Sequence, residues 1–404
     1  MSPLFELALF GQSYWLDDLT RQMIESGELQ RRVTSEGLTG VTANPAIFRA
    51  ALHASDAYDR QIGELAVHPL NGIYEALIVA DVRDACDILR PVFDRTEGRD
   101  GFVSLEVSPY LANNTQGSIA EAQRLWNAVA RPNLFIKIPG TFEGIAAVEA
   151  LVVAGINVNV TLLFSVERYE EIALAYMSAL ERRKLAGQSL ADVASVASFF
   201  LSRIDTHVDE QLREKIAGGL GKAERLLGKC AIANAKIAYR RFKELTSSRR
   251  WLALEACGAR PQRLLWASTS TKNPAYDELM YVESLIGPHT INTLPRKTIA
   301  AFAERGKVTA SLEQRSNEAI QVMRDLKRAG IDVPQVTRQL LDEGIGSFIG
   351  ALNDILQTIG TKAITSPPGG RQDELRSPAA DLQEPITSSS MRTGEHHAQQ
   401  HQET

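Results

Sequence analysis

Short apolar runs alternate with longer amphipathic stretches from about residue 13 to residue 363. Short runs bounded by polar and turn-forming residues are typical of buried strands, whereas apolar residues spaced three or four apart are typical of helices. The runs that we expect to form strands are SYWLDD (13–18), LTGVTA (38–43), FVSLEVSP (102–109), LFIKIPG (134–140), INVNVTLLF (156–164), SVASFFLS (195–202), RLLWASTS (263–270) and HTINTLP (289–295).

Helical patterns separate most of these runs, most clearly at residues 120–130, 166–187 and 223–248. Eight strands that alternate with helices predict an α/β protein with a (β/α)8 TIM barrel. A doubly wound open sheet is the rival architecture, but no glycine-rich phosphate loop follows any of the strands. The long gap after the second strand is expected to hold extra helices, such as one over residues 71–93.

The composition changes after the barrel pattern ends. From about residue 366 the chain is rich in Pro, Gly, Ser, Gln and Glu and has almost no large apolar residues. Such a segment cannot offset its ordering entropy by burial. We therefore expect one barrel over residues 1–363 and a disordered polar tail over residues 364–404.

The overall charge narrows the possible partners. The chain of 404 residues has a net charge of -5, so no basic surface for nucleic acid is expected. No apolar run is long enough to cross a bilayer, and the N-terminus lacks the basic start and cleavage site of a signal peptide. These features predict a cytoplasmic protein, of a size usual for an enzyme, that binds neither nucleic acid nor membrane.

Lys137 is the least expected residue in the strand pattern, because burial of an ammonium group is costly. Side chains alternate across a strand, so Ile136 and Ile138 face one way and Lys137 the other. In a barrel the isoleucines would meet the outer helices. Lys137 would then point into the lumen near the carboxyl end of its strand, where barrel enzymes carry out chemistry.

Polar residues follow the same logic at other strand ends, among them Asp17, Glu106, Asn159, Thr161 and Ser270. Each alone has a structural interpretation. Asp17 could cap the following helix, Glu106 could form a structural ion pair with Lys137, and a lone strand lysine usually lies at an edge with its head in water. The set, at seven successive strand ends of one barrel, favours a site.

A deprotonated lysine can attack a ketone and form a Schiff base, and the protonated imine then serves as an electron sink for a carbon–carbon bond. The unperturbed pKa of lysine is about 10.4, and desolvation lowers it. Imine formation needs a proton shuttle, and cleavage needs a base, which are tasks for Glu106 and Asp17. The histidines show no metal-ligand or triad spacing at the strand ends, so neither a metal site nor a histidine-based triad is expected.

The motifs TANPAIF, SLEV, FIKIPGT, NVNVTLLFS, SFFLSRID and STSTKN together resemble those of transaldolases, over about residues 11 to 363, and the likeness is greatest to the long bacterial form. The resemblance implies a barrel without metal or organic cofactor, as a monomer or homodimer, whose partners are sugar phosphates. It implies transfer of a dihydroxyacetone unit from sedoheptulose 7-phosphate or fructose 6-phosphate to glyceraldehyde 3-phosphate or erythrose 4-phosphate, in the non-oxidative pentose phosphate pathway.

The resemblance also implies residue roles. Lys137 matches the Schiff-base lysine, Asp17 the acid/base of cleavage, and Glu106 the residue that acts through a water with the help of Thr161. The positions that match substrate-binding residues are Asn44, Asn159 and Ser198, and those that match the phosphate site are Arg203, Ser270 and Lys272. Arg203 is five residues after Ser198, so we expect it in the loop past the strand end. Within STSTKN, either Ser268 or Ser270 is the serine of the phosphate site.

Two other functions are alternatives to transfer of a dihydroxyacetone unit. A simple Schiff-base aldolase would use the same lysine and release a small ketone. A barrel that binds sugar phosphates without turnover would be expected to have lost one of Asp17, Glu106 and Lys137, and all three are present.

Overall fold

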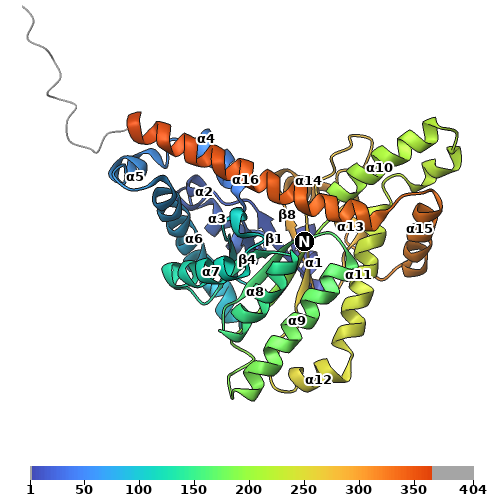
Figure 1. Cartoon of the computed structure of the whole chain (residues 1–404), viewed down its shortest axis with the longest axis horizontal. Helices are drawn as coiled ribbons and strands as arrows, with labels where there is room; N and C mark the ends of the chain where they lie inside the picture. The colour runs from blue at the N-terminus through green and yellow to red at the C-terminus, as the bar shows by residue number, and fades with distance from the viewer. Residues whose placement is uncertain (1, 366–404) are drawn as a thin grey trace, which may run out of the picture.

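The structure, a computed structural model that describes residues 2–365, is a closed barrel of eight parallel strands in chain order (Figure 1). The first strand pairs with the last in parallel register, which closes the sheet. The predicted (β/α)8 barrel is therefore confirmed. The strands are β1 (Gln12–Asp17), β2 (Gly40–Thr42), β3 (Phe102–Glu106), β4 (Leu134–Pro139), β5 (Val158–Leu163), β6 (Ser195–Phe200), β7 (Arg263–Ala267) and β8 (Thr290–Leu294).

Helices surround the barrel and fill the long connections. None of them, within residues 2–365, has the length and apolar character to cross a bilayer. The helices are α1 (Pro3–Leu9), α2 (Arg21–Glu25), α3 (Glu28–Ser35), α4 (Pro45–Ala54), α5 (Asp59–Glu64), α6 (Leu70–Arg95), η1 (Pro109–Leu111), α7 (Thr115–Val129), α8 (Phe142–Val153), α9 (Val166–Leu185), α10 (Ser202–Ala217), η2 (Gly221–Leu226), α11 (Cys230–Thr246), α12 (Arg249–Glu255), α13 (Met280–Ser284), α14 (Arg296–Arg305), α15 (Ser316–Arg328) and α16 (Val333–Thr365).

All eight predicted strands are present; β1 has the length of its sequence pattern, displaced by one residue, and the other seven are shorter than theirs. The extra helix expected over residues 71–93 lies within α6. The helix expected over residues 223–248 is divided, because the short 3-10 helix η2 ends before Gly228, whose positive φ of 65° breaks the path to α11. Helix α16 continues two residues past the expected boundary after residue 363, and the rest of the expected tail, residues 366–404, lies outside the described residues.

An aromatic layer fills the middle of the barrel. Phe102 stacks on Phe135 with ring centroids 4.1 Å apart, and Trp15 lies 6.3 Å from Phe135 although β1 and β4 are not neighbours. Such a contact across the barrel is possible only in the interior. Gly40 of β2 makes room for this layer, since a Cβ there would lie 2.3 Å from the indole ring of Trp15.

An ion pair closes the barrel below this layer. The buried carboxylate of Asp100 lies 3.0 Å from the guanidinium of Arg263 and accepts hydrogen bonds from the Ser13 hydroxyl and the Trp15 indole. These partners come from β1, β7 and the segment before β3. Removal of one partner of a buried, hydrogen-bonded ion pair is costly, because the other charge is left uncompensated. The pair therefore holds the lower ends of these strands in place.

The C-terminal helix α16 crosses from α10 past α4 to α5 and α6 (Figure 1). Its buried residues recur at helical spacing, for example Leu340, Gly344, Phe348 and Ile355. Gly344 allows the close approach, because a Cβ there would lie 2.9 Å from the side chain of Leu162 in β5. The helix therefore covers part of the carboxyl-end face, where the strands leave the barrel.

We expect Gly40→Ala to lower the free energy of unfolding by about 1–3 kcal/mol, because the added methyl group overpacks the aromatic layer. The matched control is Gly72→Ala, at an exposed helical position with nothing within 4 Å of the new Cβ. That change should leave stability equal or slightly higher, since Ala is the better helix former. Urea unfolding of both variants would measure the difference, and equal stabilities would contradict this account of the interior.

Candidate active site

A cavity of about 600 Å³ opens at the carboxyl ends of the strands. Strand ends, the loops that follow them and α16 all contribute to its walls. Of the ten site residues expected from the sequence, eight line it: Asp17, Asn44, Lys137, Thr161, Ser198, Arg203, Ser270 and Lys272. The other two, Glu106 and Asn159, lie behind the wall on either side of Lys137.

Lys137 is the buried cation of the cavity floor. It is only 4% exposed, it faces the lumen, and its neighbours Ile136 and Ile138 are fully buried behind the sheet. Its ammonium nitrogen donates a hydrogen bond to the Ala43 carbonyl at 3.0 Å and lies 3.3 Å from Glu106 Oε2. The amine is thus held at the base of the cavity with one face open to it.

Glu106 is paired in register with Lys137 across β3 and β4. Burial raises the pKa of this carboxyl, and the Lys137 ammonium opposes that rise only in part. Both carboxyl oxygens are buried, and within the described residues neither accepts a hydrogen bond. A small space of about 30 Å³ adjoins Glu106 and Ser104, which is large enough to hold a water molecule.

Asp17, at the end of β1, is partly buried and faces the cavity. Its carboxylate accepts a hydrogen bond from the Thr42 hydroxyl at 2.7 Å, and Thr42 is in turn 2.7 Å from the Thr293 hydroxyl. Burial raises the pKa of Asp17, while the Thr42 hydrogen bond and the Lys137 ammonium lower it. A carboxyl with a raised pKa is suited to hold or take a proton near neutral pH.

The polar residues near these groups differ in how many of their polar atoms already have hydrogen-bond partners. Thr161 is fully buried, its hydroxyl has no partner within the described residues, and it lines the cavity. Asn159 is also fully buried, but its amide donates to Ser104 at 3.0 Å and accepts from Ser198 at 2.7 Å. Asn44 accepts the Ile47 N–H and so caps α4, which leaves only its NH2 group for a ligand.

Two further basic residues that the sequence predicted, Arg203 and Lys272, also line the cavity. We expected Arg203 in a loop, and this was wrong: it lies in the first turn of α10. That helix begins two residues after β6 ends, so the connection is too short to include Arg203. Its guanidinium stacks on Phe200 at 5.7 Å and forms no ion pair within the described residues, and burial lowers its pKa. Lys272 is exposed and donates to the Ser270 hydroxyl at 3.1 Å.

Both serines that could belong to the phosphate site, Ser268 and Ser270, face the cavity. Ser268 has a positive φ of 55°, and its hydroxyl is 2.8 Å from that of Ser202. The arrangement of free cations, hydroxyls and a helix N-terminus here suits an anionic group.

Sequence reasoning missed several residues of the wall. Thr42 and Thr293 lie on lumen-facing positions of short strands, and alternation along the strands was the signal that could have found them. Phe348 comes from α16, with no local signal for a place in the cavity. Apolar residues of α4 form the opposite flank, namely Ala46, Ile47, Ala50, Ala51 and Ala54.

The described residues contain no group of three or more His, Cys, Asp or Glu side chains that could hold a metal ion. The groups that the cavity presents are an amine, Lys137, and two carboxyl groups of raised pKa, Asp17 and Glu106. An amine held in this way can attack a carbonyl carbon, with carboxyl groups placed to move protons on either side.

Comparisons with known proteins indicate one family, and the matches extend over nearly the whole described chain. Residues 14–359 match the family described as Transaldolase/Fructose-6-phosphate aldolase. The chain is 48% identical over 368 residues to the protein named Transaldolase of Trichodesmium erythraeum. The aligned region covers 89% of this chain and 97% of that protein. The chain is 47% identical over 372 residues to Transaldolase 2 of a Nostoc species, covering 90% and 98%, and 45% identical over 362 residues to the Transaldolase of Thermobifida fusca, covering 89% and 97%.

We expect Lys137→Met to raise the pKa of Glu106 further, because the substitution removes the one cation beside a buried carboxylate. Carboxyl ¹³C NMR titration would follow the change, with Glu106→Gln to assign the signal. Lys272→Met is the matched control: Lys272 lowers the pKa of Asp17, so its loss should move the Asp17 signal and leave that of Glu106 in place. A Glu106 titration that is the same with and without Lys137 would contradict this view of the pair.

Proposed function

The chain is an enzyme of the transaldolase family, and on that premise we propose that it transfers a dihydroxyacetone unit from a ketose phosphate to an aldose phosphate through a Schiff base on Lys137. The donors are sedoheptulose 7-phosphate and fructose 6-phosphate, and the acceptors are glyceraldehyde 3-phosphate and erythrose 4-phosphate. The reaction belongs to the non-oxidative pentose phosphate pathway. The observation that carries the proposal is the buried amine of Lys137, open to the cavity and 3.3 Å from Glu106.

In the first step Lys137 passes its proton to Glu106, 3.3 Å away, and the neutral amine attacks C2 of the donor ketone and forms a carbinolamine. Glu106 and the Thr161 hydroxyl then deliver a proton through a water, the C2 hydroxyl leaves as water, and an iminium ion remains. The Glu106 oxygens, which accept no hydrogen bond within the described residues, the small space beside them and the free Thr161 hydroxyl support this assignment. A proton held by a buried carboxyl is available to the departing hydroxyl, because the raised pKa keeps the acid form populated.

In the second step Asp17 takes the proton of the C4 hydroxyl. The C3–C4 bond breaks, its electrons move into the iminium, and the aldose phosphate leaves while an enamine stays on Lys137. Addition of the enamine to an acceptor aldehyde reverses this step, and hydrolysis of the new iminium frees the product and the amine. The place of Asp17 in the cavity wall, fixed by the Thr42 hydrogen bond, supports its role as this base.

The far end of the cavity suits the phosphate. Arg203 has no ion pair within the described residues and lies with Ser270 and Lys272 on the wall. Asn44 and Ser198 line the path between Lys137 and this end, where the hydroxyls of the sugar would lie. Asn159, which is fully buried, would act from behind by orienting Ser198.

The family description also includes an aldolase activity, which would end with release of dihydroxyacetone. Product analysis with fructose 6-phosphate distinguishes the two. A transaldolase forms sedoheptulose 7-phosphate when erythrose 4-phosphate is added and releases little dihydroxyacetone without an acceptor. Steady release of dihydroxyacetone that no acceptor diverts would favour the aldolase.

Borohydride reduction in the presence of fructose 6-phosphate should fix a three-carbon adduct on the peptide that contains Lys137. Lys137→Arg should fold but give neither adduct nor turnover, because a guanidinium stays protonated and cannot attack. Lys272→Met serves as the control, since it removes another cavity lysine and should leave the adduct on Lys137. Peptide mass mapping provides the measurement, and an adduct found only on Lys272 would refute the assignment.

The two carboxyl groups should fail at different steps. Asp17→Ala should still form an imine, so the trapped adduct should keep all the carbons of the donor. Glu106→Ala should form the imine itself slowly, and little adduct of any kind should build up. Loss of general acid–base catalysis typically lowers a rate by ~10²–10⁴, so both defects should be plain in steady-state assays. If Asp17→Ala traps only the three-carbon fragment at the normal rate, Asp17 is not the base of cleavage.

A further inference from the structure

We propose that Arg296 is a positioning residue for this reaction, which neutralises the charge of Asp18 so that the neighbouring Asp17 can work as an ionised base. The inference rests on the proposed role of Asp17. Arg296 is the first residue of α14, directly after β8, and Asp18 directly follows β1. Because β1 and β8 are paired, the two residues meet at one side of the mouth, and both line the cavity.

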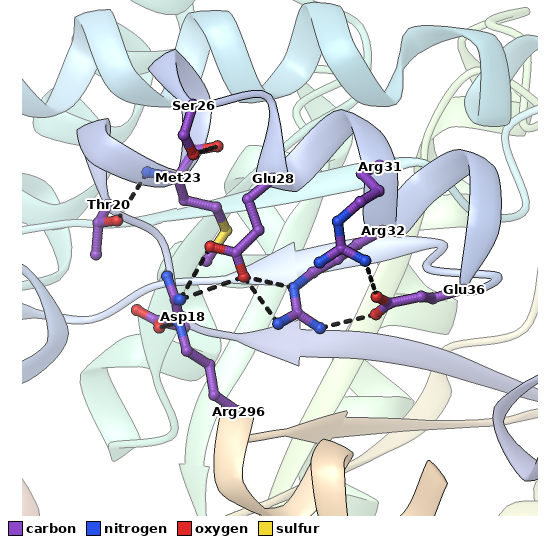
Figure 2. A network of polar contacts seen from close by, with 9 residues as sticks. All are labelled: Asp18, Thr20, Met23, Ser26, Glu28, Arg31, Arg32, Glu36 and Arg296. Atoms are coloured by element: carbon purple, nitrogen blue, oxygen red, sulfur yellow. Dashed lines mark hydrogen bonds and ion pairs between the residues drawn. The ribbon is translucent and has the colours of Figure 1, made fainter.

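Figure 2 shows the contacts that hold Arg296. Its Nε atom donates a hydrogen bond to Asp18 Oδ2, and its Nη1 atom lies 3.0 Å from Glu28 Oε2 and 3.2 Å from Glu28 Oε1. Glu28 is itself held from the other side by Arg32 at 2.8 Å. The guanidinium is therefore fixed between two carboxylates that come from separate segments of the chain.

These contacts distinguish Arg296 from the cations assigned to the phosphate. Arg203 has no carboxylate partner within the described residues and is free for an anion. Arg296 has donors committed to Asp18 and Glu28, so an incoming phosphate would have to displace a carboxylate. We therefore assign its charge to the protein side of the mouth and not to the ligand.

The charge of Asp18 matters because Asp17 lies in a partly desolvated place. Burial raises the pKa of Asp17, and the charge of Asp18 raises it further, whereas the Thr42 hydrogen bond and the charges of Lys137 and Lys272 lower it. Glu106 is the remaining carboxyl that interacts with Asp17. An Asp18 without its arginine would leave more negative charge beside the base, and Asp17 would bind its proton more tightly.

The sign of the pH effect follows from this charge balance. Asp17 must be ionised to accept the proton of the C4 hydroxyl, so activity is lost as the pH falls through its pKa. Arg296→Met should raise that pKa and move the acid limb of kcat/KM to higher pH. Asp18→Asn should move the limb to lower pH. Each shift should be roughly half to one pH unit for a unit charge at this range.

The experiment is the pH profile of kcat/KM for fructose 6-phosphate cleavage, with erythrose 4-phosphate as acceptor, in the full-length enzyme. Titration of the sugar phosphates themselves is common to all variants, so only differences between variants are read. The double variant Asp18→Asn/Arg296→Met should return the limb toward that of the parent. Arg296→Lys keeps the charge and should keep the parent limb, even if kcat falls. Glu28→Gln, the matched control, removes the other partner of Arg296 and should leave the limb in place.

Opposite shifts in the two single variants would support the inference, because a general loss of folding cannot move the limb in both directions. Limbs that stay in place, or that move the same way in both, would overturn it, as would a shift in Arg296→Lys equal to that in Arg296→Met. Asp17→Asn separates this failure from that of the proposed function. If Asp17→Asn cleaves with the parent profile, the role of Asp17 is wrong; if it is inactive while the limbs stay in place, only the role of Arg296 is wrong.

Discussion

The site depends on holding an ammonium group inside an apolar strand with too few partners to satisfy it. Lys137 has a carbonyl at 3.0 Å and a carboxylate at 3.3 Å, and its third side faces the cavity. A charge in such a place is costly, and the surrounding structure must be rigid enough to prevent it from collapsing onto better partners or escaping into water. The closed sheet provides that rigidity, because Glu106 and Asn159 are fixed in register on either side of Lys137.

The lower half of the barrel supplies the support. The stacked rings of Phe102 and Phe135 and the buried pair of Asp100 and Arg263 fill the interior beneath the cavity. Because these side chains occupy the interior beneath the cavity, the polar side chains of the upper layer point toward the mouth. The residues to which we assign the chemistry are therefore carried by strand ends, and those to which we assign the phosphate by the loops and helix starts that follow.

Alternation along buried strands is why so much of this arrangement was predictable. It placed Lys137 in the lumen with its isoleucine neighbours outside, and the same rule applied to Asp17 and Thr161. The rule says nothing of how deep a lumen-facing residue lies, so it did not reveal that Asn159 is enclosed between two serines. It also stops at the strand end, so Arg203 was expected in a loop and lies in a helix. Phe348 could not be predicted, since its place in the wall results from tertiary packing of a helix far along the chain.

That last helix has a consequence for how the protein is made. All eight strands are available once Leu294 has been synthesised, and the barrel can close at that stage. The cavity, however, lacks Phe348 and the covering turn at Gly344 until α14, α15 and most of α16 have followed. In chain order, the strands and Lys137 thus all precede the residues of α16 that finish the cavity wall. The order of synthesis therefore places the strand-end residues of the site before the helix that completes the cavity around them.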